Sequence, residues 1–176
     1  MVVMINGSFG VGKSTVARLL RQALPGSVIY DPEWAGFIIQ RLPRWIPLKR
    51  SGLDDYQHVE LWRRSVVAGV RLFRRFARGP VIVPMAFSDR GYFDEIVEGV
   101  ARIDPGLRVF CLRASVATVE GRLRGRGDEG EGAAWIARRV VECVEAHRDP
   151  HFGEAVETEG RPAPEVAREI IARIGL

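Results

Sequence analysis

GSFGVGKS, at Gly7 to Ser14, fits the pattern G-x-x-x-x-G-K-S in full. The apolar run VVMIN precedes it and an amphipathic segment follows it, as a loop between a buried strand and a helix requires. Glycines let such a loop turn its N–H groups inward, and the positive end of the following helix points at the same place. The stretch therefore predicts a phosphate-binding loop that joins a first strand to a first helix.

The residue types in this loop predict separate roles in binding ATP and Mg²⁺. Lys13 is expected to reach the β- and γ-phosphates and to act in catalysis, whereas the Ser14 hydroxyl is expected to coordinate Mg²⁺. The alternative is a glycine-rich turn that only caps a helix. We expect the nucleotide to contact Gly7, Gly10, Val11, Gly12, Lys13, Ser14 and Thr15.

Short apolar runs alternate with longer segments of helical period along the whole chain, which indicates a parallel sheet covered by helices. Strands are predicted over 2–6, 27–30, 80–85, 107–112 and 155–158. Helices are predicted over 13–23, 33–41, 55–78, 92–103, 116–124, 133–147 and 164–174. The expected fold is α/β, a three-layer sandwich with a five-stranded parallel sheet, of the P-loop, nucleotide-kinase-like kind.

We expect one domain over residues 1–176, with an acceptor-binding helical insertion at about 33–78 and a lid at about 122–139. In the longest predicted helix, apolar residues recur at steps of three or four and form a packing face: Val59, Trp62, Val66, Val70, Phe73 and Ala77. The arginines fall on the other faces, which are expected to be solvated: Arg63, Arg64, Arg71, Arg74, Arg75 and Arg78.

Composition excludes several classes of protein. The 176 residues carry a formal charge of +4, and 47% of them are hydrophobic, as in an average globular protein. The arginines are interleaved with acidic residues, so we expect no nucleic-acid partner. No apolar run approaches a bilayer span, which predicts no stable membrane insertion. The two cysteines, Cys111 and Cys143, suggest buried thiols and a cytoplasmic protein. His58, His147 and His151 lack a triad or metal spacing and are expected to be structural or on the surface.

Proteins with such a loop usually carry a second signature, a buried apolar strand that ends in Asp and holds Mg²⁺ through water, but VIVP is followed here by Met85 and Ala86. Asp31, after the second predicted strand, is expected to take this place as a metal holder or catalytic base, and Asp89 is the second choice. The alternative for Asp31 is a turn residue ahead of Pro32 that caps the next helix.

The segment RLRGR carries Arg122 and Arg126, four residues apart and next to a glycine-rich loop. Such a lid supplies arginines that neutralise charge in phosphoryl transfer, although a solvated basic helix face is the alternative. An apolar acceptor pocket is predicted where aromatic residues gather near strand ends, and its expected members are Trp34, Phe37, Met85 and Phe87. The alternative is that these side chains belong to the hydrophobic core.

The chain resembles the ATP-binding tunicamycin-resistance family, a branch of the nucleoside-monophosphate-kinase-like P-loop proteins. The resemblance covers nearly the whole sequence. It depends on INGSFGVGKS, on YDPEWAGF at Tyr30 to Phe37, on IVPM at Ile82 to Met85, on YFDEIV at Tyr92 to Val97, and on RLRGR followed by Trp135 and Cys143. It implies cytoplasmic resistance to tunicamycin, a nucleoside antibiotic with uracil, sugars and an acyl chain.

The resemblance leaves two mechanisms open. In the first, the protein uses ATP to phosphorylate a small acceptor, such as tunicamycin at a sugar hydroxyl. In the second, the protein sequesters the antibiotic and uses ATP only to order its lid. The order of strand, loop and helix, together with the resemblance, also predicts that adenine lies against Thr158 to Pro162, a segment that includes Gly160.

Overall fold

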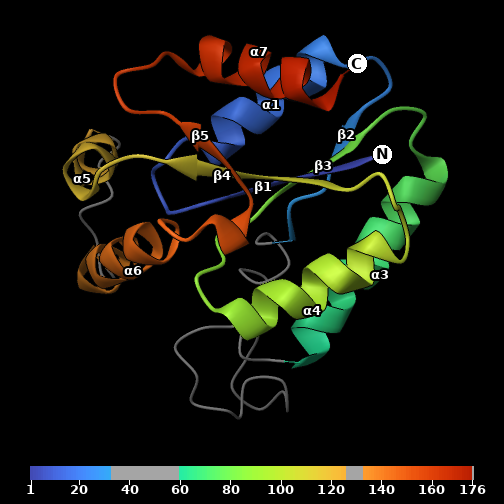
Figure 1. Ribbon diagram of the computed structural model, residues 1–176, viewed down its shortest axis with the longest axis horizontal. Helices are drawn as coiled ribbons and strands as arrows, with labels where there is room; N and C mark the ends of the chain where they lie inside the picture. The colour runs from blue at the N-terminus through green and yellow to red at the C-terminus, as the bar shows by residue number, and fades with distance from the viewer. Residues whose placement is uncertain (33–59, 126–132, 176) are drawn as a thin grey trace.

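The computed structural model describes residues 1–32, 60–125 and 133–175 as a sheet between two layers of helices. Helices α1 and α7 lie on one face of the sheet, and α3 and α4 lie on the other (Figure 1). Helices α5 and α6 stand together at one end. The expected three-layer α/β sandwich is confirmed. The predicted helix over 33–41 lies outside the described residues.

The sheet has five strands in the order β2-β3-β1-β4-β5, and all neighbouring pairs are parallel. The strand bounds are β1 Val2–Gly7, β2 Val28–Ile29, β3 Val81–Pro84, β4 Arg108–Arg113 and β5 Glu154–Glu157. Strand β1 is central and buried along its whole length, as its unbroken apolar run predicts. The phosphate-binding loop therefore begins in the middle of the carboxyl edge.

The helix bounds are α1 Lys13–Ala23, α3 Glu60–Phe76, α4 Arg90–Ala101, α5 Val116–Arg124, α6 Ala133–Ala146 and α7 Ala163–Ile174, with a 3-10 helix η3 at Pro150–Phe152. The predicted bounds of α1 and α5 are confirmed. Strand β2 is shorter than its predicted range of 27–30, because the Ser27 N–H donates to the Leu24 carbonyl in a turn.

The apolar packing face predicted for α3 is confirmed at Trp62, Val66 and Val70, which are buried against the sheet. Phe73 is instead 37% exposed, and Val59 lies outside the described residues. The prediction that Arg63 is solvated is wrong. Its guanidinium donates to Glu95 Oε2 at 2.5 Å and lies 4.2 Å from the Tyr92 ring centroid. These partners on α4 allow a charged side chain to be buried, because they replace the water that it loses.

Both cysteines are buried thiols, as predicted. Burial raises the pKa of the Cys111 thiol to about 11, and it also raises the pKa of Cys143. Neither thiol is therefore a thiolate near neutral pH. Among the described residues, none of the helices has the length and apolar character needed to cross a membrane.

Candidate nucleotide-binding site

The phosphate-binding loop connects β1 to α1 through two glycines in left-handed backbone conformations. Gly10 has φ +77° and Gly12 has φ +113°, values that L side chains rarely adopt. Gly12 also accepts the first hydrogen bonds of α1, from the N–H groups of Thr15 and Val16. A Cβ placed on Gly12 would meet nothing within 4 Å, so open space lies where that side chain would stand. The open space at Gly12 leaves room for a phosphate to approach the backbone at the start of α1.

Lys13 is the central charge of this loop. Its side chain is buried, and Nζ donates to the Gly7 carbonyl at 2.9 Å and to the Ser8 carbonyl at 3.0 Å. An ammonium group has three N–H donors, so these bonds orient it while one donor remains for an anion. Ser8 Oγ is itself buried without a hydrogen-bond partner in the described structure. A strongly held cation beside an unsatisfied hydroxyl fits a phosphate ligand.

The two residues expected to hold Mg²⁺ lie at the same edge of the sheet. Ser14 is exposed in the first turn of α1, whereas Asp31 is half-buried beyond the end of β2, with β3 between that strand and β1. Burial and the nearby Asp31 carboxylate raise the pKa of Tyr30. Among the described residues, no group of three or more His, Cys, Asp or Glu could hold a metal. A hydroxyl and a carboxylate still fit Mg²⁺, which commonly takes only one or two protein ligands beside phosphates.

Arg122 joins the phosphate-binding loop to the segment after β5. Its Nη1 donates to the Val11 carbonyl at 3.0 Å and to Thr158 Oγ1 at 3.1 Å, and Nη2 donates to the Thr158 carbonyl at 2.8 Å. Thr158 in turn donates from Oγ1 to the Arg113 carbonyl at the end of β4. The fork of one arginine therefore fixes two loops that are far apart in the sequence.

A cavity of about 190 Å³ lies between these loops, and its lining includes Gly10, Thr15, Arg122, Thr158 and Arg161. Gly160 stands beside this region with φ +63°, and a Cβ there would meet nothing within 4 Å. The cavity adjoins the phosphate-binding loop on the side of α7. The predicted adenine position against residues 158–162 coincides with this cavity and remains a prediction.

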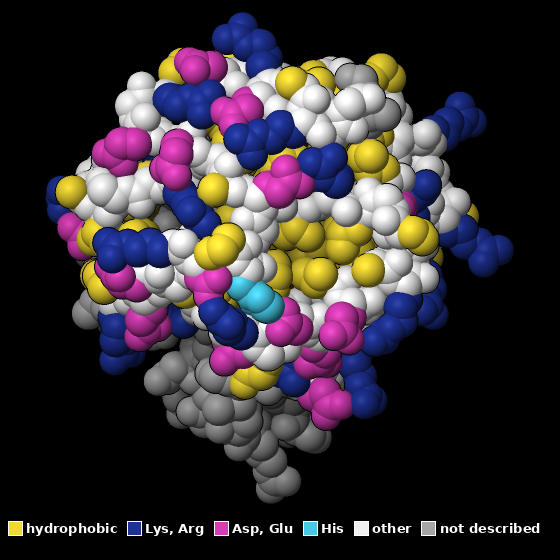
Figure 2. Space-filling model, viewed as in Figure 1, with side chains coloured by type: hydrophobic (Ala, Val, Ile, Leu, Met, Phe, Trp, Pro, Cys, Tyr) yellow, Lys and Arg dark blue, Asp and Glu magenta, His cyan; other side chains and the backbone are white. Residues whose placement is uncertain are grey.

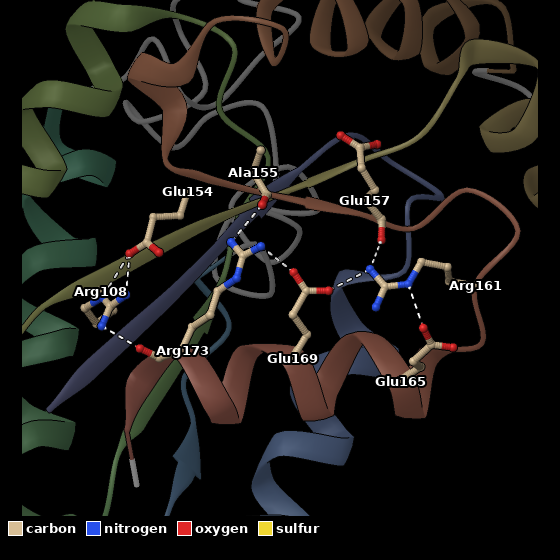
Figure 3. A network of polar contacts seen from close by, with 8 residues as sticks. All are labelled: Arg108, Glu154, Ala155, Glu157, Arg161, Glu165, Glu169 and Arg173. Atoms are coloured by element: carbon tan, nitrogen blue, oxygen red, sulfur yellow. Dashed lines mark hydrogen bonds and ion pairs between the residues drawn. The ribbon is translucent and has the colours of Figure 1, made fainter.

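Arg161 is held in place by acidic residues of α7, as Figure 3 shows. Its Nη1 donates to Glu169 Oε2 at 2.7 Å and to the Glu157 carbonyl at 2.9 Å, and Nε pairs with Glu165 at 3.1 Å. The hydrogen bond that Arg161 donates to Glu169 is the largest of the effects that raise the pKa of Arg161. The network extends through Arg173 to Arg108 on β4, so the wall of the cavity is fixed to the sheet.

Glu159 fastens the beginning of α5 to the same segment. Its carboxylate accepts hydrogen bonds from the Ser115 N–H at 2.7 Å, from the Ser115 hydroxyl, and from the Thr118 hydroxyl. The bond from Thr118, followed by those from Ser115, holds the pKa of Glu159 below its usual range. Neither Glu159 nor Thr158 belongs to a recognisable sequence motif. Their contribution to the position of α5 and Arg122 was therefore not predicted from the sequence.

We expect Arg122→Lys to weaken ATP binding about tenfold, because an ammonium group cannot reproduce the fork that joins Val11 to Thr158. The measurement is the dissociation constant of ATP by calorimetry. Arg124→Lys is the matched control, since Arg124 is exposed on the same helix. Equal affinities in the two variants would contradict the role of Arg122 in shaping the nucleotide site.

On the other side of the phosphate-binding loop, the backbone of Phe87 is held by three hydrogen bonds. Asn6 accepts from the Phe87 N–H at 2.9 Å and donates to its carbonyl at 3.2 Å. The His147 Nε2 lies 2.6 Å from the same carbonyl and donates to it. The segment after β3 is thereby fixed to the strand that leads into the loop.

The predicted acceptor residues divide into two groups. Met85 and Phe87 are almost fully buried at 1% and 0% exposure, within the core that also holds Trp62. Trp34 and Phe37 lie outside the described residues, as does the predicted lid residue Arg126. Of the other lid residues, Arg139 pairs with Glu142 at 3.0 Å. Asp89 caps α4 by accepting from the Tyr92 N–H. The roles predicted for these residues, in acceptor binding, in the lid or in holding Mg²⁺, remain predictions.

His147 is a buried, neutral side chain. Burial, and to a smaller extent the charges of Lys13, Arg113 and Arg139, lower its pKa from 6.5 to about 4, against the opposing effect of its bond to Phe87. His147 also lines a cavity of about 380 Å³ together with Ser8, Arg113 and Ser115. The expectation that the histidine is structural agrees with this placement.

The neutral state of His147 predicts an acid-sensitive fold. The unfolded chain takes up this proton near pH 6.5, whereas the folded chain resists it until about pH 4. The free energy of unfolding should therefore fall as the pH drops through this interval, by about 3 kcal/mol in all from this residue. Urea unfolding at several pH values tests it, with His147→Gln as the non-titrating control. If the free energy of unfolding depends on pH in the same way in both proteins, the assignment of this effect to His147 is wrong.

A model of the AAA domain family matches residues 2–151 of the chain. The guanylate kinase of Thermosynechococcus vestitus is 31% identical over 165 residues, which cover 86% of this chain and 82% of that protein. The structure of the Deinococcus radiodurans tunicamycin resistance protein superposes with a TM-score of 0.74 at 28% identity, covering 99% of this chain and 96% of that one.

A gluconokinase from Sinorhizobium meliloti superposes with a TM-score of 0.64 over 98% of this chain and 90% of that one. Its identity of 20% means that this likeness shows the fold alone. Together with the family match, these similarities confirm the resemblance inferred from the sequence and the kinase-like P-loop fold.

Proposed function

We propose, since the chain belongs to the AAA domain family of P-loop proteins, that it binds ATP with Mg²⁺ and transfers the terminal phosphoryl group to a hydroxyl of a small acceptor. Tunicamycin is the acceptor that we propose first. The observation that carries the proposal is the arrangement around one loop. The buried Lys13 ammonium lies in the loop, and a cavity shaped by Arg122 adjoins it on one side.

In this proposal the chain contributes positioning and charge. The backbone N–H groups from Gly7 to Gly12 and the Lys13 ammonium would hold the phosphates, while the cavity between Thr158 and Arg161 would take the base. Ser14 and Asp31 would hold Mg²⁺, which supplies neutralisation of the charge on the phosphate oxygens. Asp31 would alternatively accept the proton of the attacking hydroxyl, because it follows a strand at the edge where α/β sheets bind ligands.

The choice of acceptor follows from one of the relatives that cover nearly the whole chain. The Deinococcus protein with 28% identity is a tunicamycin resistance protein, and it aligns with 99% of this chain. The chain carries Trp34 and Phe37 in the predicted insertion between β2 and α3, where we propose that they contact the apolar part of the antibiotic.

Sequestration without transfer is the second candidate function. One observation favours it: the residues that follow β3, Met85 and Ala86, are apolar and buried, so no carboxylate stands at that strand end. A protein that lacks this acid could bind ATP and the drug without joining them. The two functions differ in whether the antibiotic is chemically changed.

The deciding experiment is mass spectrometry of tunicamycin after incubation with the protein, ATP and Mg²⁺. A mass gain of one phosphate that requires ATP establishes the transfer. Unmodified drug that co-elutes tightly with the protein establishes sequestration. Guanosine monophosphate belongs in the same assay, because the relative from Thermosynechococcus is a guanylate kinase. Phosphorylation of this nucleotide, with tunicamycin neither changed nor bound, would overturn the proposed acceptor.

A further inference from the structure

Helix α3 exposes apolar side chains that a solvated helix would normally bury. Phe76 is 74% exposed, Leu61 58%, Leu72 56% and Phe73 37%. Leu61, Leu72 and Phe76 are separated by eleven and four residues, so they form a stripe along one side of the helix. This stripe is distinct from the buried face of α3, which packs on the sheet through Val66 and Val70.

The stripe borders an apolar hollow at the edge of the sheet. The hollow has a volume of about 340 Å³ and is lined by Val28, Leu72, Phe73, Phe76 and Ala77. Val28 belongs to β2, which is the terminal strand in the sheet order. Phe73 is fixed there because its ring stacks on Tyr30 with the centroids 4.9 Å apart. The surface is therefore rigid, apolar and open.

Arginines occupy the adjoining side of the same helix. Arg64, Arg71 and Arg75 follow one another at steps of seven and four, which places them along one stripe of α3. Arg71, Arg74 and Arg75 border a second hollow of about 360 Å³ beside Asp104. Figure 2 shows Lys and Arg side chains standing out along the side of the molecule where Figure 1 draws α3.

The single carboxylate that lines the second hollow is already engaged. Asp104 accepts from Arg74 at 2.6 Å and from the N-terminal ammonium at 3.0 Å, and these bonds help to hold its pKa below the usual range against the effect of burial. Arg71 and Arg75 are exposed, and the described residues provide no ion pair for either. Two free guanidinium groups beside an apolar stripe form a surface with a strong preference for phosphate groups.

We propose that the outer face of α3, from Leu61 to Phe76, docks this protein on the surface of an anionic lipid bilayer. The apolar stripe would enter the boundary between headgroups and acyl chains, and the arginines would contact the lipid phosphates. A helix of 17 residues with this many charges lies along a membrane and does not cross it.

Charge decides between this occupant and a second copy of the chain. A two-fold contact that packs α3 antiparallel to its copy would place the arginine stripes of both copies close together, which is unfavourable without intervening carboxylates. An anionic bilayer instead matches the arginines and accepts the apolar side chains in one contact. The proposal does not depend on the identity of the phosphoryl acceptor.

The test is co-sedimentation of the full chain with vesicles of phosphatidylcholine alone or mixed with phosphatidylglycerol. The protein should bind the mixed vesicles, lose binding as salt is added, and ignore pure phosphatidylcholine. Leu72→Glu with Phe76→Glu, and separately Arg71→Gln with Arg75→Gln, should each weaken binding about tenfold or more. Because these side chains are exposed, the variants should keep the thermal unfolding temperature and ATP affinity of the parent.

Matched control variants distinguish binding through α3 from non-specific binding by other exposed apolar or positively charged side chains. Val141→Glu replaces an apolar side chain that is 44% exposed on α6, and Arg124→Gln with Arg148→Gln removes two exposed arginines elsewhere. Both should bind vesicles as the parent does. Equal losses in controls and α3 variants would overturn the proposal, as would no binding to anionic vesicles at low salt. A concentration-dependent dimer that Phe76→Glu dissociates, without vesicle binding, would assign the face to a second copy.

Discussion

Lys13→Ala should weaken ATP binding about 10²-fold and reduce any phosphoryl transfer by about 10²–10³-fold. The substitution removes a buried ammonium that two carbonyl groups, of Gly7 and Ser8, hold at the centre of the phosphate-binding loop. No other side chain of this loop carries positive charge, and the neighbouring Arg122 is engaged by Val11 and Thr158. Calorimetry with ATP and a transfer assay measure the two effects.

The same substitution leaves two carbonyl groups without their donor, which costs about 1–3 kcal/mol if water does not replace it. Thermal unfolding must therefore accompany the binding measurement. Lys13→Met keeps the aliphatic stem and should lose ATP binding to the same extent. Arg21→Ala, an exposed change in the last turn of α1, is the matched control and should bind ATP normally. Unchanged nucleotide affinity in a folded Lys13→Ala protein would contradict the assignment of the loop.

Asp31→Asn should lower phosphoryl transfer by about 10²–10⁴-fold while ATP still binds. The change keeps the shape of the side chain and removes the charge that would accept a proton or hold Mg²⁺. Asp31 is half-buried beyond β2 at the carboxyl edge, so its amide can be accommodated. The turnover number and the dissociation constant of ATP, measured on the same preparation, separate catalysis from binding.

Asp89→Asn is the control for this prediction and also tests the second-choice acid. Asp89 caps α4 through the Tyr92 N–H, and asparagine caps a helix about as well. The control should therefore keep both transfer and stability. If Asp31→Asn instead weakens ATP and drug binding by equal factors, then Asp31 supports the fold and the proposed division of the site is wrong. A loss confined to Asp89→Asn would identify Asp89 as the acid.

Much of the secondary structure could be predicted because it depends on interactions between residues that are close in the sequence. The bounds of α1 and α5 could be predicted because amphipathic period and a capping signal, such as Ser115 before α5, act within a few residues. The phosphate-binding loop is equally local, since its glycines, Lys13 and the helix that follows are contiguous. The turn that shortens β2 was missed because its hydrogen bond from Ser27 to Leu24 competes with the strand at short range.

Burial of polar side chains could not be read from the sequence, because it depends on partners that the chain brings from elsewhere. Arg63 was assigned to solvent, yet Glu95 and Tyr92 on α4 surround it. Asn6 and His147 carry no motif, and both become positioning residues because the fold places the backbone of Phe87, 81 and 60 residues away, between them. The contact of Asn6 requires that β1 pair with β3, and the contact of His147 requires that the end of α6 pack beside the segment that follows β3.

The sequence by itself determined the class of fold, the loop that binds phosphate and the residues that form it, because periodicity and a contiguous motif need no distant partner. Tertiary structure alone decided the strand order with β1 at the centre. It also decided that Arg122 joins Val11 to Thr158, and that Glu159 anchors α5 beside them. These contacts span from 36 to 111 residues, and long-range pairing of this kind is fixed by the packing of whole elements and leaves no local pattern.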